Sequence, residues 1–280
     1  MARRRALLGA AVACLLLAGC TPGVPAEPPF TVTVVQPRTG IAMGIIAMQV
    51  TNTSEQTIAV ASAELDSAYL GSPLVWDGEP VTLTPGRAVD LRVSLDTWDC
   101  ETDADADATA TVGYSIEGGG AGTATVSAPD TTIVLPGLWQ GACLAERVAD
   151  VVDLRAVALE SSGEVGAVGE LVLSTEATGS EGSVEVHSVE STTLLAPFDG
   201  ASGVPTVSLE VELGPEGPPE LRVPFVPNRC DAHALAEDKI GTRIPLQVTV
   251  GELSGRLVLP ASDELRAQMY AFYGAYCGLP

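Results

Sequence analysis

Two short segments of the chain carry side chains that could bind a metal ion, and the first is an acidic run. Asp103, Asp105 and Asp107 alternate with other residues, so on an extended segment their carboxylates would lie on one side and repel one another. Ca²⁺, which prefers oxygen ligands, would relieve that repulsion. The remainder of a calcium loop is missing, because Ala108 stands where glycine is needed and Tyr114 stands where a bidentate glutamate is needed. A solvated acidic loop is the competing interpretation.

The second segment contains one of the two histidines of the chain. If residues 232–238 form a helical turn, His233 and Glu237 are neighbours on one face, and Asp231 lies close to them. This spacing suggests either a carboxylate-histidine metal site or a titratable ion pair. The alternative is a purely structural turn that ties Cys230 to the fold.

Other residues offer little for catalysis. The chain has no Gly-x-Ser-x-Gly or Ser-x-x-Lys motif, and its glycine clusters lack the spacing and the lysine of a phosphate loop. His187 alternates with valines and points away from their face, while Trp98 and Trp139 lie near cysteines and are expected to pack over a disulfide. Paired carboxylates for hydrolysis stay open, since 36 acidic residues are present. We expect a protein that is not an enzyme.

The N-terminus indicates where the chain works. Three arginines at positions 3–5 precede a short apolar run, which is the build of a secretory signal and is too short to cross a bilayer. The four residues Leu17-Ala18-Gly19-Cys20 resemble the lipobox of bacterial lipoprotein precursors. This resemblance implies that Cys20 receives a diacylglyceryl anchor and becomes the new N-terminus. Residues 1–19 would then be the signal peptide, and the proline-rich residues 20–29 would be a tether. Export by the general or the twin-arginine route is left open.

The charge of the chain limits its partners. The net charge is −22, and removal of the signal peptide with its three arginines would make it −25. Such a surface repels nucleic acid and anionic lipid headgroups, so the anchor must hold the protein at the membrane against its charge. We expect no nucleic-acid partner, whereas basic partners and divalent cations are favoured.

An internal duplication organises the remainder. At an offset of 130, residues 89–93 align with 219–223 and Cys100 aligns with Cys230, while residues 139–143 match 273–277. With Cys14 removed and Cys20 acylated, four cysteines remain, which in an exported chain argues for two disulfides. Three pairings are possible in principle, and the repeat selects Cys100 with Cys143 and Cys230 with Cys277. The predicted domains are residues 30–146 and 147–280.

Each half shows apolar residues at a period of two, punctuated by turn residues, which is typical of a β-sandwich. The predicted strands are residues 31–35, 47–51, 57–61, 89–95, 110–116 and 123–126 in the first half, and 151–156, 170–174, 184–186, 207–213, 221–225, 244–250 and 256–259 in the second. Pro224 and Pro245 suggest edge positions or bulges. The disulfides are expected to clamp the final hairpin of each half.

The C-terminal segment departs from this pattern. Ser262 precedes two acidic residues, and Leu265, Met269, Phe272 and Tyr276 follow at helical spacing, which predicts an amphipathic helix over 262–274. We expect its apolar stripe to pack on the second sandwich. Presentation of the helix to a partner is the alternative.

Residues 83–95 resemble the turn-then-strand segment of bacterial immunoglobulin-like modules. Together with the duplication, the period-two pattern and the C-terminal helix, this resemblance implies an all-β fold of two tandem immunoglobulin-like sandwiches with a short C-terminal helix. We expect a lipid-anchored protein of the cell envelope, on the extracytoplasmic face of the membrane. It would act as a non-catalytic binding or scaffolding module for an unidentified envelope protein. An assembly accessory of an envelope complex is the first alternative, and a solute-binding lipoprotein is the second.

Overall fold

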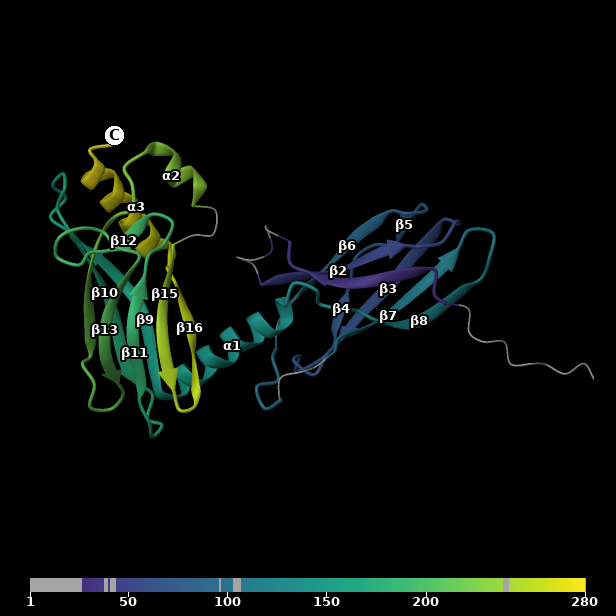
Figure 1. Ribbon diagram of the computed structural model, residues 1–280, viewed down its shortest axis with the longest axis horizontal. Helices are drawn as coiled ribbons and strands as arrows, with labels where there is room; N and C mark the ends of the chain where they lie inside the picture. The colour runs from purple at the N-terminus through teal and green to yellow at the C-terminus, as the bar shows by residue number, and fades with distance from the viewer. Residues whose placement is uncertain are drawn as a thin grey trace, which may run out of the picture.

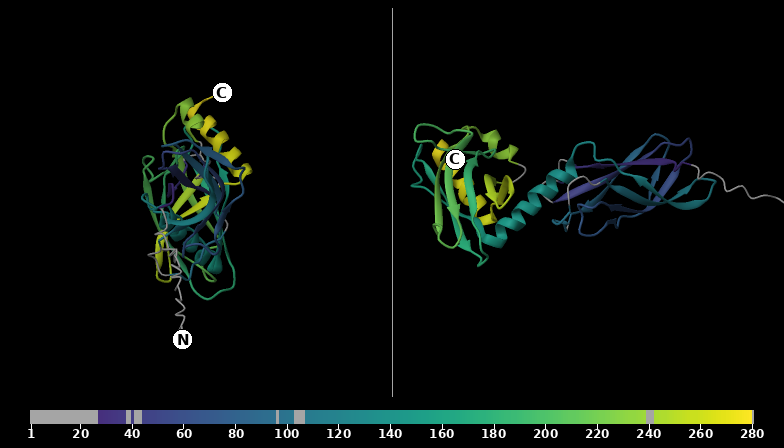
Figure 2. Two further views of the ribbon diagram at one scale, coloured as in Figure 1. Left: turned by 90° about the vertical axis from the view of Figure 1, so that its right-hand side faces the viewer. Right: turned by 60° about the horizontal axis from the view of Figure 1, so that its bottom comes forward.

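The computed structural model describes residues 27–37, 40, 44–95, 97–102, 107–238 and 242–279. These residues form two antiparallel β-sandwiches, one after the other in the chain, joined by helix α1 (Val134–Val151). Figure 1 and Figure 2 show the two sandwiches at opposite ends of an elongated molecule with α1 between them. The predicted all-β, immunoglobulin-like fold class is confirmed.

The first sandwich consists of two sheets. One contains β1 (Phe30–Val35), β2 (Ile45–Asn52) and β6 (Ala88–Ser94), in the order β1-β2-β6. The other has the order β4-β3-β7-β8 and is built from β3 (Ile58–Asp66), β4 (Leu74–Trp76), β7 (Thr109–Ile116) and β8 (Ala121–Ser127). The short strand β5 (Val81–Leu83) also pairs with β3.

The second sandwich has two four-stranded sheets. The sheet of order β12-β14-β10-β9 contains β9 (Val152–Glu160), β10 (Gly169–Ala177), β12 (Leu195–Pro197) and β14 (Glu220–Pro227). The sheet of order β13-β11-β15-β16 contains β11 (Val184–Glu190), β13 (Thr206–Leu213), β15 (Arg243–Val250) and β16 (Leu253–Pro260).

The strand pairing of the two sandwiches is the same. β1-β2-β6 corresponds to β9-β10-β14, and β3-β7-β8 corresponds to β11-β15-β16. Strands β4 and β5 pair successively along β3, as the single strand β13 pairs along β11, so β13 corresponds to an interrupted strand in the first sandwich. Only β12 has no counterpart among the described strands. The repeated order is what an internal duplication predicts.

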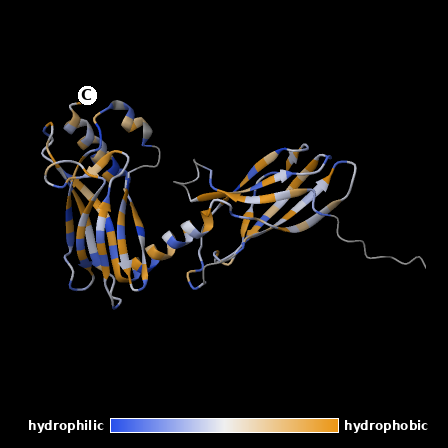
Figure 3. Ribbon diagram, viewed as in Figure 1, coloured by the Kyte–Doolittle hydropathy of each residue, from blue (hydrophilic) through white to orange (hydrophobic). Residues whose placement is uncertain are grey.

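Period-two patterning explains these elements. Along the strands, apolar and polar residues alternate, as the bands in Figure 3 show, and the apolar ones face the space between the two sheets. Two buried clusters result, one in each sandwich. Each predicted strand is present. The strands β4, β5 and β12 were not predicted, because three residues are too few to display a period.

The expectation of edge positions or bulges for the two prolines is wrong, because their strands lie inside their sheets and no register shift occurs at either proline. Pro224 is in β14, between β10 and β12, and Pro245 is in β15, between β11 and β16. Each proline nevertheless has a paired residue on one side only, because β12 and β11 begin their pairing just beyond it. A missing backbone N–H is tolerated where no second strand needs it.

Helix α3 (Asp263–Cys277) confirms the predicted C-terminal helix. The hydroxyl of Ser262 accepts a hydrogen bond from the N–H of Leu265, and Gly278, with φ 62°, ends the helix in a left-handed conformation. Leu265, Met269 and Phe272 are buried in the second sandwich, as expected. The helix thus packs on its own module.

Helix α1 was not predicted. Val134 and Leu135, at its start, belong to the buried cluster of the first sandwich, whereas Leu144, Val148 and Val151 belong to that of the second. The predicted domain division at 146/147 falls inside this helix. Among the described residues, no helix is long and apolar enough to cross a bilayer.

Candidate functional site

The disulfide of the first sandwich joins the segment after β6 to helix α1. Cys100 and Cys143 are bonded, with their Cα atoms 5.5 Å apart. The indole Nε1 of Trp139 donates a hydrogen bond of 2.8 Å to the carbonyl of Asp99, next to the half-cystine. The ring of Tyr69 lies 5.5 Å from that of Trp139. We call this arrangement of bridge and aromatic side chain the first clamp.

The second sandwich repeats the arrangement. Cys230, which follows β14, is bonded to Cys277 in α3, with Cα atoms 5.4 Å apart. Tyr273 stands four residues before Cys277, as Trp139 stands four before Cys143. Its hydroxyl donates to the carbonyls of Arg229 and Asp231, at 2.7 and 2.8 Å, and accepts from the N–H of Asp231. This is the second clamp.

Both predicted disulfide pairings are confirmed, with one correction. The bridges were expected to clamp the final hairpin of each half, but each one holds the helix that follows the hairpin. The reason is that the chain after β8 or β16 turns into a helix, and this helix carries the second half-cystine. Trp98 is half-buried and packs on the first core, and Trp139 does so too.

One of the candidate metal ligands near Cys230, Asp231, has a structural role. Asp231 is the N-cap of helix α2 (Ala232–Glu237), where its carboxylate accepts from the N–H groups of His233 and Ala234. The same carboxylate forms an ion pair with Arg229, at 3.0 Å. The side chain of His233 is exposed, and that of Glu237 lies outside the described part of the chain. The structural turn thus accounts for Asp231, and the metal site stays a prediction.

The candidate calcium ligands are described only in part. Asp103 and Asp105 lie outside the described residues, and Asp107 is exposed just before β7. Within the described ranges, no group of three or more His, Cys, Asp or Glu side chains could hold a metal ion. The calcium site also stays a prediction.

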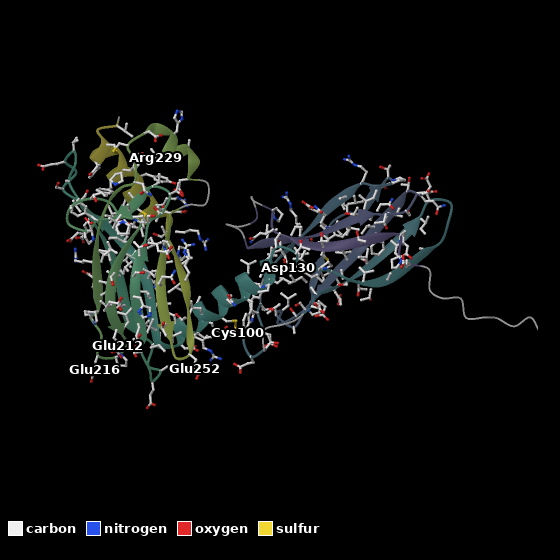
Figure 4. The ribbon with its side chains drawn as sticks, in the orientation of Figure 1. Cys100, Asp130, Glu212, Glu216, Arg229 and Glu252 are labelled. Carbon is white, nitrogen blue, oxygen red and sulfur yellow. A yellow bond between two sulfur atoms is a disulfide. The ribbon has the colours of Figure 1, made fainter. Side chains whose placement is uncertain are left out.

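An open hollow lies where α1 meets the second sandwich. Its volume is about 970 Å³, and the last turns of α1 line it together with the β10–β11 and β15–β16 turns. Asp150, Glu181, Glu185 and Glu252 contribute carboxylates, while Arg147 is already paired with Glu101, at 2.8 Å. Figure 4 shows Glu212 and Glu216 at the same end of the sandwich as Glu252. This end of the second sandwich is strongly acidic.

Shifted pKa values mark ion pairs, hydrogen bonds and burial in the second sandwich. Hydrogen bonds and the charge of the Arg222 guanidinium hold the pKa of Glu160 below its ordinary value. A hydrogen bond from Ser208, followed by the contact with His187, does the same for the pKa of Glu210. Burial, reinforced by the hydrogen bond to Asp238, raises the pKa of Tyr270.

His187 lies where the alternation places it. Its Nε2 is 2.8 Å from the Thr249 hydroxyl and its Nδ1 is 3.4 Å from Glu210, on the outer face of the sheet, while Val184 and Val186 are fully buried. These contacts tie three neighbouring strands together. They suit a structural side chain.

No family model matches the chain, and no curated protein matches it. Solved structures resemble it weakly. The YadV chaperone is 13% identical, with 83% of this chain and 100% of that chain covered and a TM-score of 0.24. The CsuC–CsuE chaperone–tip adhesion subunit pre-assembly complex from archaic chaperone-usher Csu pili of Acinetobacter baumannii is 9% identical, with 83% and 100% covered and a TM-score of 0.21.

A red sea bream transglutaminase is 9% identical, with 84% of this chain but 32% of that chain covered and a TM-score of 0.22. The strand pairing of the chain itself defines two immunoglobulin-like sandwiches.

Proposed function

We propose that this chain is a lipid-anchored protein of the extracytoplasmic face of the cell membrane, where its two sandwiches bind or scaffold another envelope protein without catalysis. In this proposal Cys20 carries the diacylglyceryl group. Residues 21–29 then form the proline-rich tether between the membrane and β1.

The observation that carries the proposal is the pair of clamps. Disulfides persist in oxidising compartments and are rare in the cytosol. Four cysteines form two intramolecular bridges, one in each sandwich. The segment Leu17-Ala18-Gly19-Cys20 provides the signal for attachment to the membrane. Since the four bridging cysteines pair with one another, none of them is available to bond Cys20.

The arrangement of the two sandwiches supports a binding or scaffolding role. Helix α1 is fixed to the first sandwich by the Cys100–Cys143 bridge and to the second by Leu144, Val148 and Val151. An isolated helix of this length is marginally stable in water, so α1 depends on the burial of its two ends. Because each end is buried in a different sandwich, α1 holds the two modules at a set spacing. An elongated, acidic pair of modules offers a large surface to a basic partner.

Attachment is tested by expressing the full precursor in a bacterial host and separating the membranes. We expect the wild-type protein in the membrane fraction, with a diacylglyceryl mass on the N-terminal peptide. Cys20→Ala should abolish that mass and release the protein from the membrane. Cys14→Ala is the matched control, because this cysteine leaves with the signal peptide and its change should alter neither result. Wild-type protein recovered from the cytosol with free thiols would refute the proposal.

Binding is tested by chemical cross-linking of intact membranes, followed by mass spectrometry. We expect one reproducible envelope protein linked to the wild-type chain. The same protein should be lost when the anchored chain is truncated after its tether. Recovery of unlinked chains alone, in hosts that contain the native envelope, would count against a scaffolding role.

A further inference from the structure

β8 is the outer strand of its sheet, and it pairs only with β7. It forms the lower margin of the first sandwich in Figure 1. The N–H of Ile116 donates to the carbonyl of Gly120 and the N–H of Ala128 donates to that of Ala108, and both pairs are directly opposite in the β7–β8 register. Hydrogen-bonded pairs alternate along an antiparallel ladder. The backbone groups of Gly122, Ala124 and Val126 therefore face β7.

The odd-numbered residues of β8 turn their backbone groups outward. The N–H and C=O groups of Ala121, Thr123, Thr125 and Ser127 find no hydrogen-bond partner among the described residues. Such a row of donors and acceptors is a template for one more strand.

Protein sheets usually protect their outer strands with charge, proline, bulges, short length or a covering element. β6 carries Asp90 and Arg92, β13 carries Glu210 and Glu212 beside a register shift, and β4 and β12 are three residues long. β1 is also uncharged, but near its end the N–H of Val34 is bonded to the carbonyl of Pro129. β8 has seven residues, no charge and no proline.

The equivalent strand of the second sandwich is covered. β16 corresponds to β8, and helix α1 packs along it, with Leu144 against Gly255. The same strand position is therefore covered by α1 in the second module. In the first module, besides its partner β7, only β1 approaches it among the described elements, near the Val34–Pro129 hydrogen bond just beyond the end of β8. The half-buried side chains of Ala124 and Val126, at the margin of the first core, would be covered by a strand added to β8.

The ends of β8 define the charge of its partner. Glu117 is exposed at the turn before the strand, and Asp107 is exposed beside its far end. A second copy of the chain, paired antiparallel through β8, would bring Glu117 of one copy toward Asp107 of the other, and both chains are strongly acidic. An uncharged extended segment with basic residues at its two ends fits instead.

We propose that β8 is a strand-addition site, at which an extended segment of a partner protein, apolar at alternate positions and flanked by lysine or arginine, joins the sheet beside Thr123 and Thr125. Main-chain hydrogen bonds would supply affinity, and the terminal charges would select the partner. The inference rests on the proposed binding function and gives it a contact surface.

The test uses the full mature chain, with its anchor, in detergent micelles. The probe is the synthetic peptide Lys-Val-Thr-Val-Thr-Val-Lys, and a matched peptide has glutamate in place of both lysines. We expect the lysine peptide to bind, to slow hydrogen exchange at Thr123, Thr125 and Ser127, and to leave the other outer strands unchanged. The glutamate peptide should bind about tenfold more weakly, because its ends meet Glu117 and Asp107.

The matched variants are Thr123→Pro and Thr123→Val. Proline removes an outward N–H while the bonds to β7 persist, so the melting temperature should hold and the peptide should bind about tenfold more weakly. Valine keeps the N–H, so binding should equal that of the wild type. Equal binding by the proline variant, or exchange that does not slow at β8, would overturn the proposal.

Self-association that Thr123→Pro abolishes, measured by sedimentation, would also overturn it by assigning the edge to a second copy. Cross-linking in membranes distinguishes this proposal from the proposed binding function. If the Thr123→Pro chain still cross-links to the envelope partner, the binding function is retained and β8 is not its site.

Discussion

The two sandwiches share a strand order and a clamp, yet they use the helix that follows the last strand in different ways. α3 buries Leu265, Met269 and Phe272 in the sandwich that it follows. α1 buries its first turn in the sandwich that it follows and Leu144 and Val148 in the next one. The comparison teaches that one helix position can close a module or join two modules, and that the placement of its apolar side chains decides which.

Removal of the disulfides is the largest perturbation of this comparison. The paired residues are separated by 43 and 47 positions, so the chain-entropy model assigns each bridge about 4 kcal/mol. We expect Cys100→Ala with Cys143→Ala, and Cys230→Ala with Cys277→Ala, to cost similar free energies of unfolding in urea titrations. A difference of more than about 2 kcal/mol would show that the clamps are not equivalent in stability.

Truncation of Leu144 tests whether α1 belongs to the second module in energy as well as in position. The side chain is 4% exposed and packs in the second core, so Leu144→Ala should cost about 3 kcal/mol. Native-state hydrogen exchange should lose protection in β15 and β16. Leu138→Ala, in the same helix but half-buried against the first core, is the control and should cost less. Loss of protection confined to β7 and β8 in Leu144→Ala would contradict the assignment.

The aromatic members of the two clamps sharpen the comparison further. Tyr273→Phe removes a buried hydroxyl that contacts three backbone groups, and we expect a loss of about 2 kcal/mol. Trp139→Phe removes one hydrogen bond at a half-buried position, for which about 1 kcal/mol is expected. Thermal unfolding followed by circular dichroism measures both. A larger loss for Trp139→Phe would reverse the order that these hydrogen bonds predict.

The smallest expected difference is a dependence on pH. Arg222 pairs with Glu160, Glu170 and Glu220, whereas Arg92, aligned with it, forms no ion pair among the described residues. The lowered pKa of Glu160 gives stability above the ordinary glutamate pKa, and this stability is lost as pH falls through the folded-state value. Arg222→Gln should therefore lower the melting temperature slightly at pH 6, and this effect should shrink as the pH is lowered to 3.

Arg92→Gln is the matched control, and it should change the melting temperature equally at both pH values. Because Glu160 is exposed, the effect of Arg222→Gln should shrink in high salt. An effect at pH 3 as large as that at pH 6 would show that Arg222 acts through packing instead of charge.

The strands and the last helix were predictable because their signals are local. Alternation fixed the long strands, and Ser262 with the two acidic residues after it marked the start of α3. The clamps were predictable in part. The duplication aligned Trp139 with Tyr273 and paired the cysteines, but a hydrogen bond from Tyr273 to a carbonyl 44 residues away has no local signal.

Helix α1 could not be predicted from the same signals. Pro136, Gly137 and Gly141 lie within it, and Ile133, with φ 56°, stands at its N-cap. The N–H of Leu135 is capped from outside the helix, by the carboxylate of Asp130. Formation of α1 depends on burial in two cores that lie far apart along the chain. The role of Asp231 as a cap was equally hidden, since a carboxylate next to a histidine has the same sequence whether it binds a metal or an N–H group.

Each bridge joins cysteines that are consecutive among the four that pair, and this order has a consequence for biogenesis. If the chain is exported unfolded by the general route, as one form of the proposed function has it, Cys100 and Cys143 reach the oxidising compartment before Cys230 emerges. Oxidation in order of appearance then gives native connectivity in both modules. Maturation should proceed without a disulfide isomerase, provided that oxidation of the thiols is as fast as translocation of the polypeptide.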